Sequence, residues 1–221
     1  MPDNERSNWD SSITDLAPSD PNDVRVLYNE FSSDYNTTLA TWGYRAPNVV
    51  ADYLAQHVAT DAPVLDAGCG TGLTGTALAK RGFSDIIGSD LSPDSIAIAR
   101  ETGCYRKLHN LDLTERLPYE EDVFGGISCV GVFSYIPDLK PVLIDLLRVL
   151  APGGTLVFTQ REDHFKQYNS AELFDQLHGT GGFERMLETT SQPYLPGNPS
   201  FADDIGVHYF VWRKHTITLN K

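Results

Sequence analysis

The chain has 221 residues, of which 41% are hydrophobic, and a formal net charge of -13 at pH 7. This length predicts one domain with a substantial core, and the acidic surface disfavours nucleic acid or an anionic membrane as a partner. No apolar run is long enough to cross a bilayer and no signal peptide is visible, so we expect a cytoplasmic protein whose three scattered cysteines form no disulfide framework.

Residues 1–20 are polar and acidic and lack apolar periodicity, which predicts a disordered tail. Residues 21–221 are expected to form a single domain, in which residues 21–60 make two helices that cover the rest. Apolar and aromatic side chains recur at helical spacing in the first of these helices. Such a stripe is typical of core packing, but it fits equally well with closure over a ligand by Tyr28 and Tyr35.

The glycine-rich stretch Val64–Gly72 stands between a buried-strand pattern and an apolar helix pattern. A strand that turns through glycines into a helix presents backbone N–H groups at the helix N-terminus, which suits a polar ligand. The glycines in register with the strand end are Gly68, Gly70 and Gly72, so we expect the carboxylate of Asp66 beside the loop. A carboxylate repels a pyrophosphate and attracts a ligand with an amine and a sulfonium, such as S-adenosylmethionine.

The segment VLDAGCGTG at residues 64–72 closely resembles motif I of the class I S-adenosylmethionine-dependent methyltransferases. The Leu-Arg-Val-Leu-x-Pro-Gly-Gly run at residues 147–154 is a second feature of that family. A Tyr-Asn-Glu-Phe-Ser-Ser-Asp-Tyr stretch at residues 28–35 and a Tyr-Arg-Ala-Pro turn at residues 44–47 resemble a narrower group, the methyltransferase-like proteins of the Williams–Beuren syndrome chromosomal region. The resemblance implies an α/β fold, with a Rossmann-like, doubly wound, seven-stranded sheet in the order 3-2-1-4-5-7-6 and the last strand antiparallel. It also implies S-adenosyl-L-methionine as the cofactor.

An acidic residue at the end of the second strand can accept hydrogen bonds from both hydroxyls of a ribose, which makes Asp90 the best single ribose ligand. Leu91 follows and would pack on the adenine. The family resemblance implies that Asp112 accepts the exocyclic amine and that the Leu113 backbone meets a ring nitrogen, although Asp112 also fits a solvated loop. Arg45 fits either the cofactor carboxylate or a surface ion pair. The full set of expected cofactor residues is Tyr28, Tyr35, Arg45, Asp66, Gly68, Cys69, Gly70, Gly72, Asp90, Leu91, Asp112, Leu113, Cys129 and Val130.

The methyl acceptor should lie beyond the carboxyl ends of the strands. The loop of residues 133–138 follows the fourth predicted strand there, and its Tyr135 is a candidate for shaping the acceptor pocket. Residues 161–164 follow the fifth predicted strand, Thr155–Gln160. They offer His164 as a general base or Arg161 as a group that orients an anionic acceptor, and they fit a plain polar loop equally well.

These features predict a methyltransferase that transfers a methyl group to a small-molecule acceptor by in-line displacement. The Asn-Pro-Pro-Tyr type of motif that marks amide or nucleobase amine methylation is absent after the fourth strand. A protein that binds the cofactor without catalysis remains an alternative. A less favoured one is an NAD(P)-dependent oxidoreductase, which would use the G-x-G-x-x-G match at Gly70–Gly75. We expect no metal, and a monomer or a homodimer.

Overall fold

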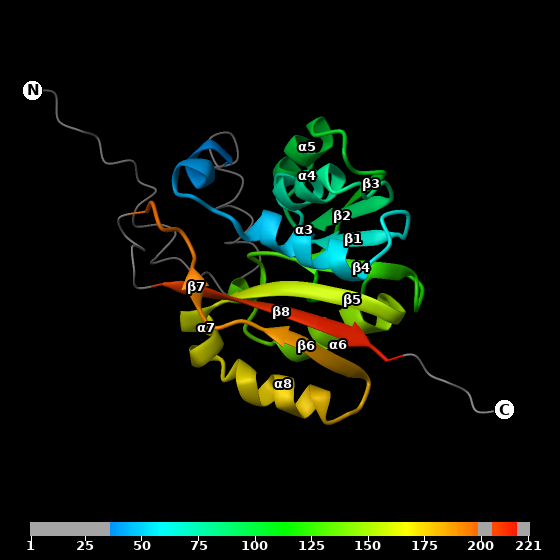
Figure 1. Ribbon diagram of the computed structural model, residues 1–221. Helices are drawn as coiled ribbons and strands as arrows, with labels where there is room; N and C mark the ends of the chain where they lie inside the picture. The colour runs from blue at the N-terminus through cyan, green and yellow to red at the C-terminus, as the bar shows by residue number, and fades with distance from the viewer. Residues whose placement is uncertain (1–35, 199–204, 216–221) are drawn as a thin grey trace, which may run out of the picture.

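The computed structural model describes residues 36–198 and 205–215. The predicted tail of residues 1–20, together with Tyr28 and Tyr35, lies outside the described residues. The described residues form an α/β fold, in which helices pack around a mixed β-sheet (Figure 1).

In the described part of the chain the sheet has eight strands in the order β3-β2-β1-β4-β5-β8-β6, and β7 pairs with β8 (Figure 1). The strands are β1 Val64–Ala67, β2 Ile86–Asp90, β3 Lys107–Asn110, β4 Phe124–Cys129, β5 Leu150–Arg161, β6 Phe183–Glu188, β7 Gln192–Pro193 and β8 Gly206–Lys214. Strands β1 to β5 are parallel, whereas β8 is antiparallel to β5 and to β6. The predicted Rossmann-like order, with the last strand inserted antiparallel between the fifth and the sixth, is therefore confirmed. The two-residue strand β7 is an addition to the predicted seven.

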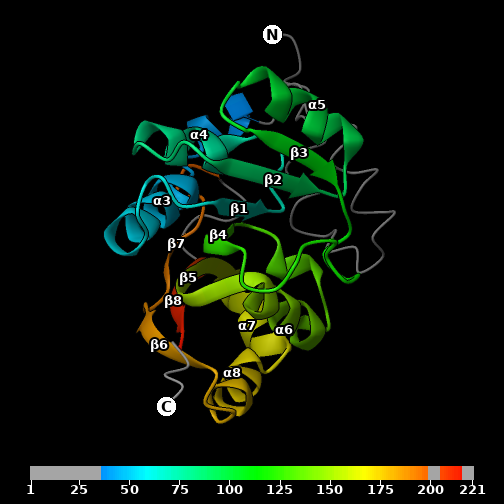
Figure 2. The same cartoon turned by 90° about the vertical axis from the view of Figure 1, so that its right-hand side faces the viewer.

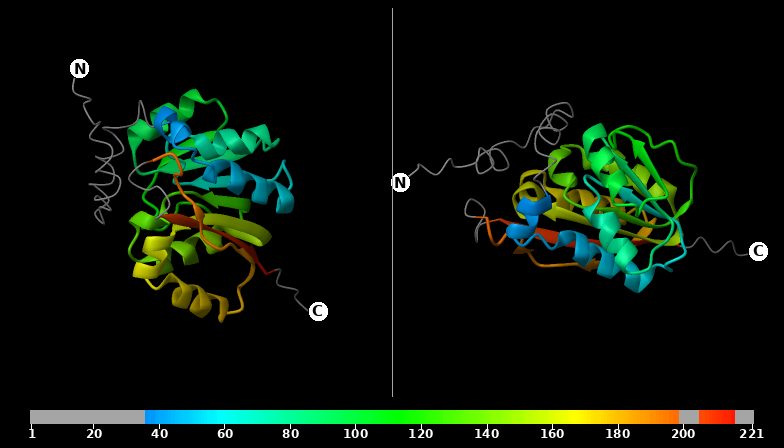
Figure 3. Two further views of the ribbon diagram at one scale, coloured as in Figure 1. Left: turned by 60° about the vertical axis from the view of Figure 1, so that its left-hand side comes forward. Right: turned by 90° about the horizontal axis from the view of Figure 1, so that it is seen from above.

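Helices cover both faces of this sheet (Figure 2). They are α3 Ala46–His57, α4 Leu73–Lys80, α5 Pro93–Glu101, α6 Leu139–Val149, α7 Glu162–Gln167 and α8 Ser170–His178, with a 3₁₀ turn η1 at Phe133–Tyr135. Residues 36–41 are also helical. Seen from above, the cyan α3 and the yellow α7 lie on opposite sides of the red strand β8 (Figure 3).

The core follows from the alternation of side chains along buried parallel strands. All four residues of β1 are buried. Val64 packs in a cluster with the apolar side chains of α3 and α4, whereas its neighbour Leu65 packs in a cluster with those of α6 and α8. Because β1 to β5 are parallel, their carboxyl ends meet at one edge of the sheet, where a ligand can be held.

Helix α6 begins at Leu139, because the side chain of Asp138 accepts a hydrogen bond from a first-turn N–H and caps the helix. Two later segments differ from the sequence predictions. Strand β5 begins at Leu150 rather than at Thr155, and it pairs with β4 across a bulge near Phe124. The acidic residues after β5 begin a helix, α7, because Glu162 and Asp163 favour a first helical turn.

Candidate active site

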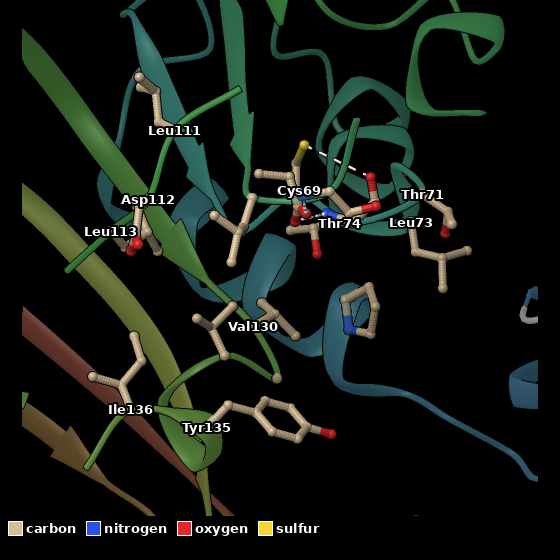
Figure 4. A pocket seen from close by; sticks show the side chains of 18 of the residues that line it. Cys69, Thr71, Leu73, Thr74, Leu111, Asp112, Leu113, Val130, Tyr135 and Ile136 are labelled. Carbon is tan, nitrogen blue, oxygen red and sulfur yellow. Dashed lines mark hydrogen bonds between the residues drawn. The ribbon is translucent and has the colours of Figure 1, made fainter. Parts of the chain in front are cut away.

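A cavity opens at the carboxyl edge of the sheet, between the loop after β1 and the segment after β4 (Figure 4). Asp112 and Leu113 lie on one side of it, Leu73 lies on the opposite side, and Tyr135 lies on a third (Figure 4). The predicted cofactor and acceptor residues that line this cavity are Gly68, Cys69, Gly70, Asp90, Leu91, Asp112, Leu113, Val130 and Tyr135.

The loop after β1 needs glycine at two positions, for different reasons. At Gly68, with φ +72°, a Cβ atom would lie 2.2 Å from Cγ2 of Val132, so the backbone there passes too close to the segment after β4 for any side chain. Gly70 has φ +51°, and a Cβ atom would meet nothing within 4 Å. Gly70 is therefore open to the cavity, where a ligand can approach its backbone closely.

Asp90 ends β2 with its carboxylate held by two backbone groups. Its Oδ2 accepts from Gly70 N at 2.8 Å and its Oδ1 accepts from Ser92 N at 2.9 Å. The backbone after it is fixed as well, because the side-chain nitrogen of Asn110 donates to the carbonyls of Asp90 and Leu91. Burial raises the pKa of Asp90. Each carboxylate oxygen has a second lone pair. The carboxylate of Asp90 can therefore accept two further hydrogen bonds from hydroxyl groups.

Asp112, in the turn after β3, offers a similar acceptor. Its Oδ1 accepts from both the N–H and the hydroxyl of Thr114, at 2.8 and 2.7 Å. These bonds fix the side chain and leave Oδ2 without a partner among residues 36–198 and 205–215. Leu91, Leu111 and Leu113 line the cavity near it. An apolar wall beside a fixed carboxylate oxygen suits a flat aromatic group that carries an amine.

Three predicted cofactor residues do not line the cavity. Asp66 lies in β1 just before the loop, but it is fully buried and accepts hydrogen bonds from Tyr105 at 2.7 Å and Ser128 at 2.9 Å. Burial raises its pKa to about 6. Gly72 packs against helix α5, since a Cβ atom there would come within 3.2 Å of that backbone. Cys129 is fully buried in the core at the end of β4.

Arg45 and His164 also lie off the cavity wall. Arg45 is exposed at the start of α3 and makes no salt bridge within the described residues. His164 is buried in α7, beside Tyr168, and its Nδ1 has no hydrogen-bond partner in the described part of the chain. Burial lowers the pKa of this imidazole. Sequence reasoning placed it in a loop, whereas the helix α7 turns it into the protein.

The structure adds two tyrosines that sequence reasoning missed. Tyr44 and Tyr194 line the cavity and pack edge to face, with ring centroids 5.6 Å apart. Tyr44 stands next to the predicted Arg45, within the turn that resembles the narrower methyltransferase group. Tyr194 follows β7 in a long connection, and no local pattern in the sequence marks it.

Comparisons with known proteins show which family this chain belongs to. A family model described as a methyltransferase domain matches residues 65–158. Methyltransferase-like protein 27 of Homo sapiens is 33% identical over 168 residues, which are 73% of this chain and 68% of that protein. The chain belongs to the S-adenosylmethionine-dependent methyltransferases. Its cofactor is accordingly S-adenosyl-L-methionine, and the oxidoreductase alternative is set aside.

Two further relatives of this methyltransferase show how far the similarity extends. The ubiquinone biosynthesis O-methyltransferase of Methylococcus capsulatus is 34% identical over 111 residues, but these are only 47% of this chain and 45% of that enzyme. The methyltransferase in complex with the Haloferax volcanii Trm112 activator has a TM-score of 0.63 at 18% identity, over 85% of this chain and 97% of the other. The second similarity supports the fold alone.

Among the described residues, no helix has the length and hydropathy that crossing a membrane requires.

Proposed function

We propose that this methyltransferase transfers the methyl group of S-adenosylmethionine to a small-molecule acceptor by in-line displacement. The observation that carries the proposal is the two-ended character of the cavity. The carboxylates of Asp90 and Asp112 follow the neighbouring strands β2 and β3, whereas Tyr44 packs on Tyr194, and Tyr135 lies on a different side of the cavity from Asp112 (Figure 4). One continuous space can therefore receive a nucleoside and, next to it, an apolar partner.

At the carboxylate end the described residues fit the cofactor. Asp90 would accept hydrogen bonds from the two ribose hydroxyls, because two backbone groups already orient it. Asp112 would accept the adenine amine on the oxygen that Thr114 leaves open. The leucines beside them would pack on the adenine, and the open backbone at Gly70 would let the ligand approach the loop.

The N-terminal segment would close this end. Thr71, in the loop of residues 68–72, donates a hydrogen bond to the side chain of Asn36 at 2.5 Å. The first described residue is thereby held against Thr71, which lines the cavity, and residues 21–35 precede it in the chain. We therefore keep the proposal that Tyr28 and Tyr35 cover the methionine part of the cofactor.

Beside the tyrosines the lining favours a small aromatic acceptor. Ile136 and Pro137 add apolar surface beside Tyr135. A name among the relatives, ubiquinone biosynthesis O-methyltransferase, is consistent with a phenolic acceptor of this kind. The formal charge of -13 argues against nucleic acid. The similarity to the Williams–Beuren group indicates which methyltransferases are related to this chain, but it does not identify the methyl acceptor.

The proton of the acceptor limits its chemistry. No histidine lines the cavity in the described part of the chain, since His164 is buried in α7. We therefore propose an acceptor that attacks without a strong base, such as an acidic phenol, a thiol or a neutral amine. The bound cofactor supplies an electrophilic methyl group, and the residues of the chain exclude water and align the two reactants. Such positioning lowers a barrier by about 7–11 kcal/mol in favourable cases.

The test is a measurement of S-adenosylhomocysteine release with catechols, simple phenols, thiols and amines as acceptors. Tyr194→Ala should raise the KM of the acceptor and leave S-adenosylhomocysteine affinity within about twofold of the parent. Tyr168→Ala is the matched control, because Tyr168 packs on His164 away from the cavity. Turnover of an amide or nucleic acid instead would contradict the proposal. Cofactor binding without turnover of any class would favour the non-catalytic alternative.

A further inference from the structure

The ring of Tyr105 packs beside the loop of residues 68–72, in a space that Gly72, Gly75 and Gly88 leave open. A Cβ atom on Gly75 would lie 2.2 Å from Cζ of the Tyr105 ring, one on Gly88 would lie 2.9 Å from Cε1, and one on Gly72 would lie 3.3 Å from Cε2. These glycines belong to α4, β2 and the loop between β1 and α4. A side chain at Gly75 would collide with the ring itself, whereas at Gly88 and Gly72 it would meet Leu108 or Thr102 as well as the ring. The ring fits between these three segments, which places its hydroxyl deep in the fold.

That hydroxyl joins two elements on either side of the loop. It donates to Oδ2 of Asp66 in β1 at 2.7 Å and accepts from the N–H of Gly75 at 3.2 Å. Gly75 lies in the first turn of α4, where an N–H has no partner within the helix. The loop of residues 68–72 runs between these two anchors. Tyr105 therefore fixes the distance that the loop has to span.

The groups that face Asp66 explain why the hydroxyl matters. From β4, Ser128 donates to its Oδ1 at 2.9 Å. From β2 the carboxylate of Asp90 repels it, and this repulsion adds to the effect of burial in raising the pKa of Asp66. The neighbouring thiols of Cys69 and Cys129 are neutral, because burial raises the pKa of each. The hydrogen bonds from Tyr105 and Ser128, together with the backbone N–H of Gly75, stabilise the charged form of Asp66.

We propose that Tyr105 is a positioning residue for the cofactor: its hydroxyl holds the loop of residues 68–72 between Asp66 and helix α4. Through the loop it keeps the N–H of Gly70 on the carboxylate of Asp90, which is the group oriented toward the ribose. Tyr105 does not line the cavity, so it acts through these neighbours. The inference rests on the cofactor, which the family establishes, and not on the proposed acceptor.

Without this hydroxyl the loop would be correctly placed for only part of the time. The apparent dissociation constant rises in inverse proportion to the fraction of molecules that are competent to bind. A competent fraction of about one tenth gives an affinity about tenfold weaker. The loss of a hydrogen bond to ionised Asp66 also raises the pKa of that carboxyl. Asp66 does not line the cavity, so its negative charge would act on the ammonium group of the cofactor only through the buried interior. Protonation removes that attraction, so the decline of affinity on acidification should begin at a higher pH.

The experiment is calorimetric titration of the full chain with S-adenosylhomocysteine between pH 5 and pH 8.5. Tyr105→Phe keeps the ring in its slot and removes only the hydroxyl. Tyr119→Phe is the matched control, since the hydroxyl of Tyr119 is buried and makes no hydrogen bond to the described residues. Ser128→Ala is the second variant, because it removes the other hydrogen bond to Asp66.

We expect Tyr105→Phe to bind about tenfold more weakly at pH 7.5, with the midpoint of its affinity decline moved to higher pH. Ser128→Ala should move that midpoint in the same direction, and Tyr119→Phe should match the parent in both respects. A merely structural tyrosine would lower the unfolding temperature and leave the affinity of the folded protein and its pH midpoint unchanged. An affinity of Tyr105→Phe within twofold of the parent, or an unmoved midpoint, would overturn the proposal.

Discussion

Replacing Asp66 with asparagine should stabilise the methyltransferase at neutral and alkaline pH. Asp66 is fully buried in β1, and its pKa is raised from 3.8 to about 6 by burial. In the unfolded chain this carboxyl ionises near pH 4, whereas in the folded protein it ionises near pH 6. The folded state therefore binds more protons between these values, so the contribution of Asp66 to stability is largest below pH 4 and is lost as the pH rises to 6 and above.

The magnitude follows from that displacement of the pKa. Ionising Asp66 in the folded state costs about 3 kcal/mol of unfolding free energy at pH 8 and about half as much at pH 5. An asparagine removes this cost, but its single oxygen can accept from only one of the two hydroxyls that donate to Asp66, and the disturbed second hydrogen bond loses about 1–1.5 kcal/mol. Asp66→Asn should therefore be more stable than the parent by about 1–2 kcal/mol at pH 8 and within about 0.5 kcal/mol of it at pH 5.

Urea unfolding of both proteins without ligand measures this difference, because the remaining carboxyl groups are common to both and cancel. The decisive quantity is how the stability difference changes with pH. A difference that is the same at pH 5 and pH 8, or a variant less stable than the parent at pH 8, would refute the reasoning that Asp66 carries an unfavourable buried charge. S-adenosylhomocysteine titration of the same samples would show whether the gain in stability accompanies a loss of affinity.

Other residues give predictions of their own. Asp90→Asn keeps the side-chain shape but replaces one acceptor oxygen with a donor, so calorimetry should show S-adenosylhomocysteine affinity about tenfold to a hundredfold weaker; undiminished affinity would exclude Asp90 as the ribose ligand. Gly68→Ala should lose about 2–3 kcal/mol in urea unfolding because of its positive φ and its contact with Val132, and adding Val132→Ala should restore part of that loss. If the second substitution restores nothing, the steric explanation is wrong. Asp163→Asn should cost about 1 kcal/mol, because it removes the carboxylate that pairs with the buried guanidinium of Arg161; a thermal unfolding temperature equal to that of the parent would contradict this.

Much of the fold could be predicted because its signals are local. The glycine pattern after Val64 marks a strand, a loop and a helix in succession, and proline after Ser92 marks the start of the next helix. Asp90 stands at the end of a strand that the sequence delimits well. For this reason the sequence alone predicts which edge of the sheet holds the ligand site.

The remaining features depend on partners far apart in the sequence. Tyr105 reaches Asp66 across 39 positions, and hydrophobic periodicity records that a residue is buried without saying what it meets. Tyr194 lies in a connection that has no periodic pattern of its own. The sequence predicts His164 in a loop because charged side chains suit both loops and first helical turns, and only the packing of α7 decides between them.

The position of β8 has a consequence for the order in which the chain assembles. Strand β6 pairs with β8 and not with β5, although β6 is synthesised first. During synthesis both β5 and β6 therefore present unpaired edges until residues 206–214 have emerged from the ribosome. Unpaired edges are the surfaces through which partly folded chains associate. The delay exposes the newly made protein to aggregation, and a chaperone that shields β5 would act at this stage.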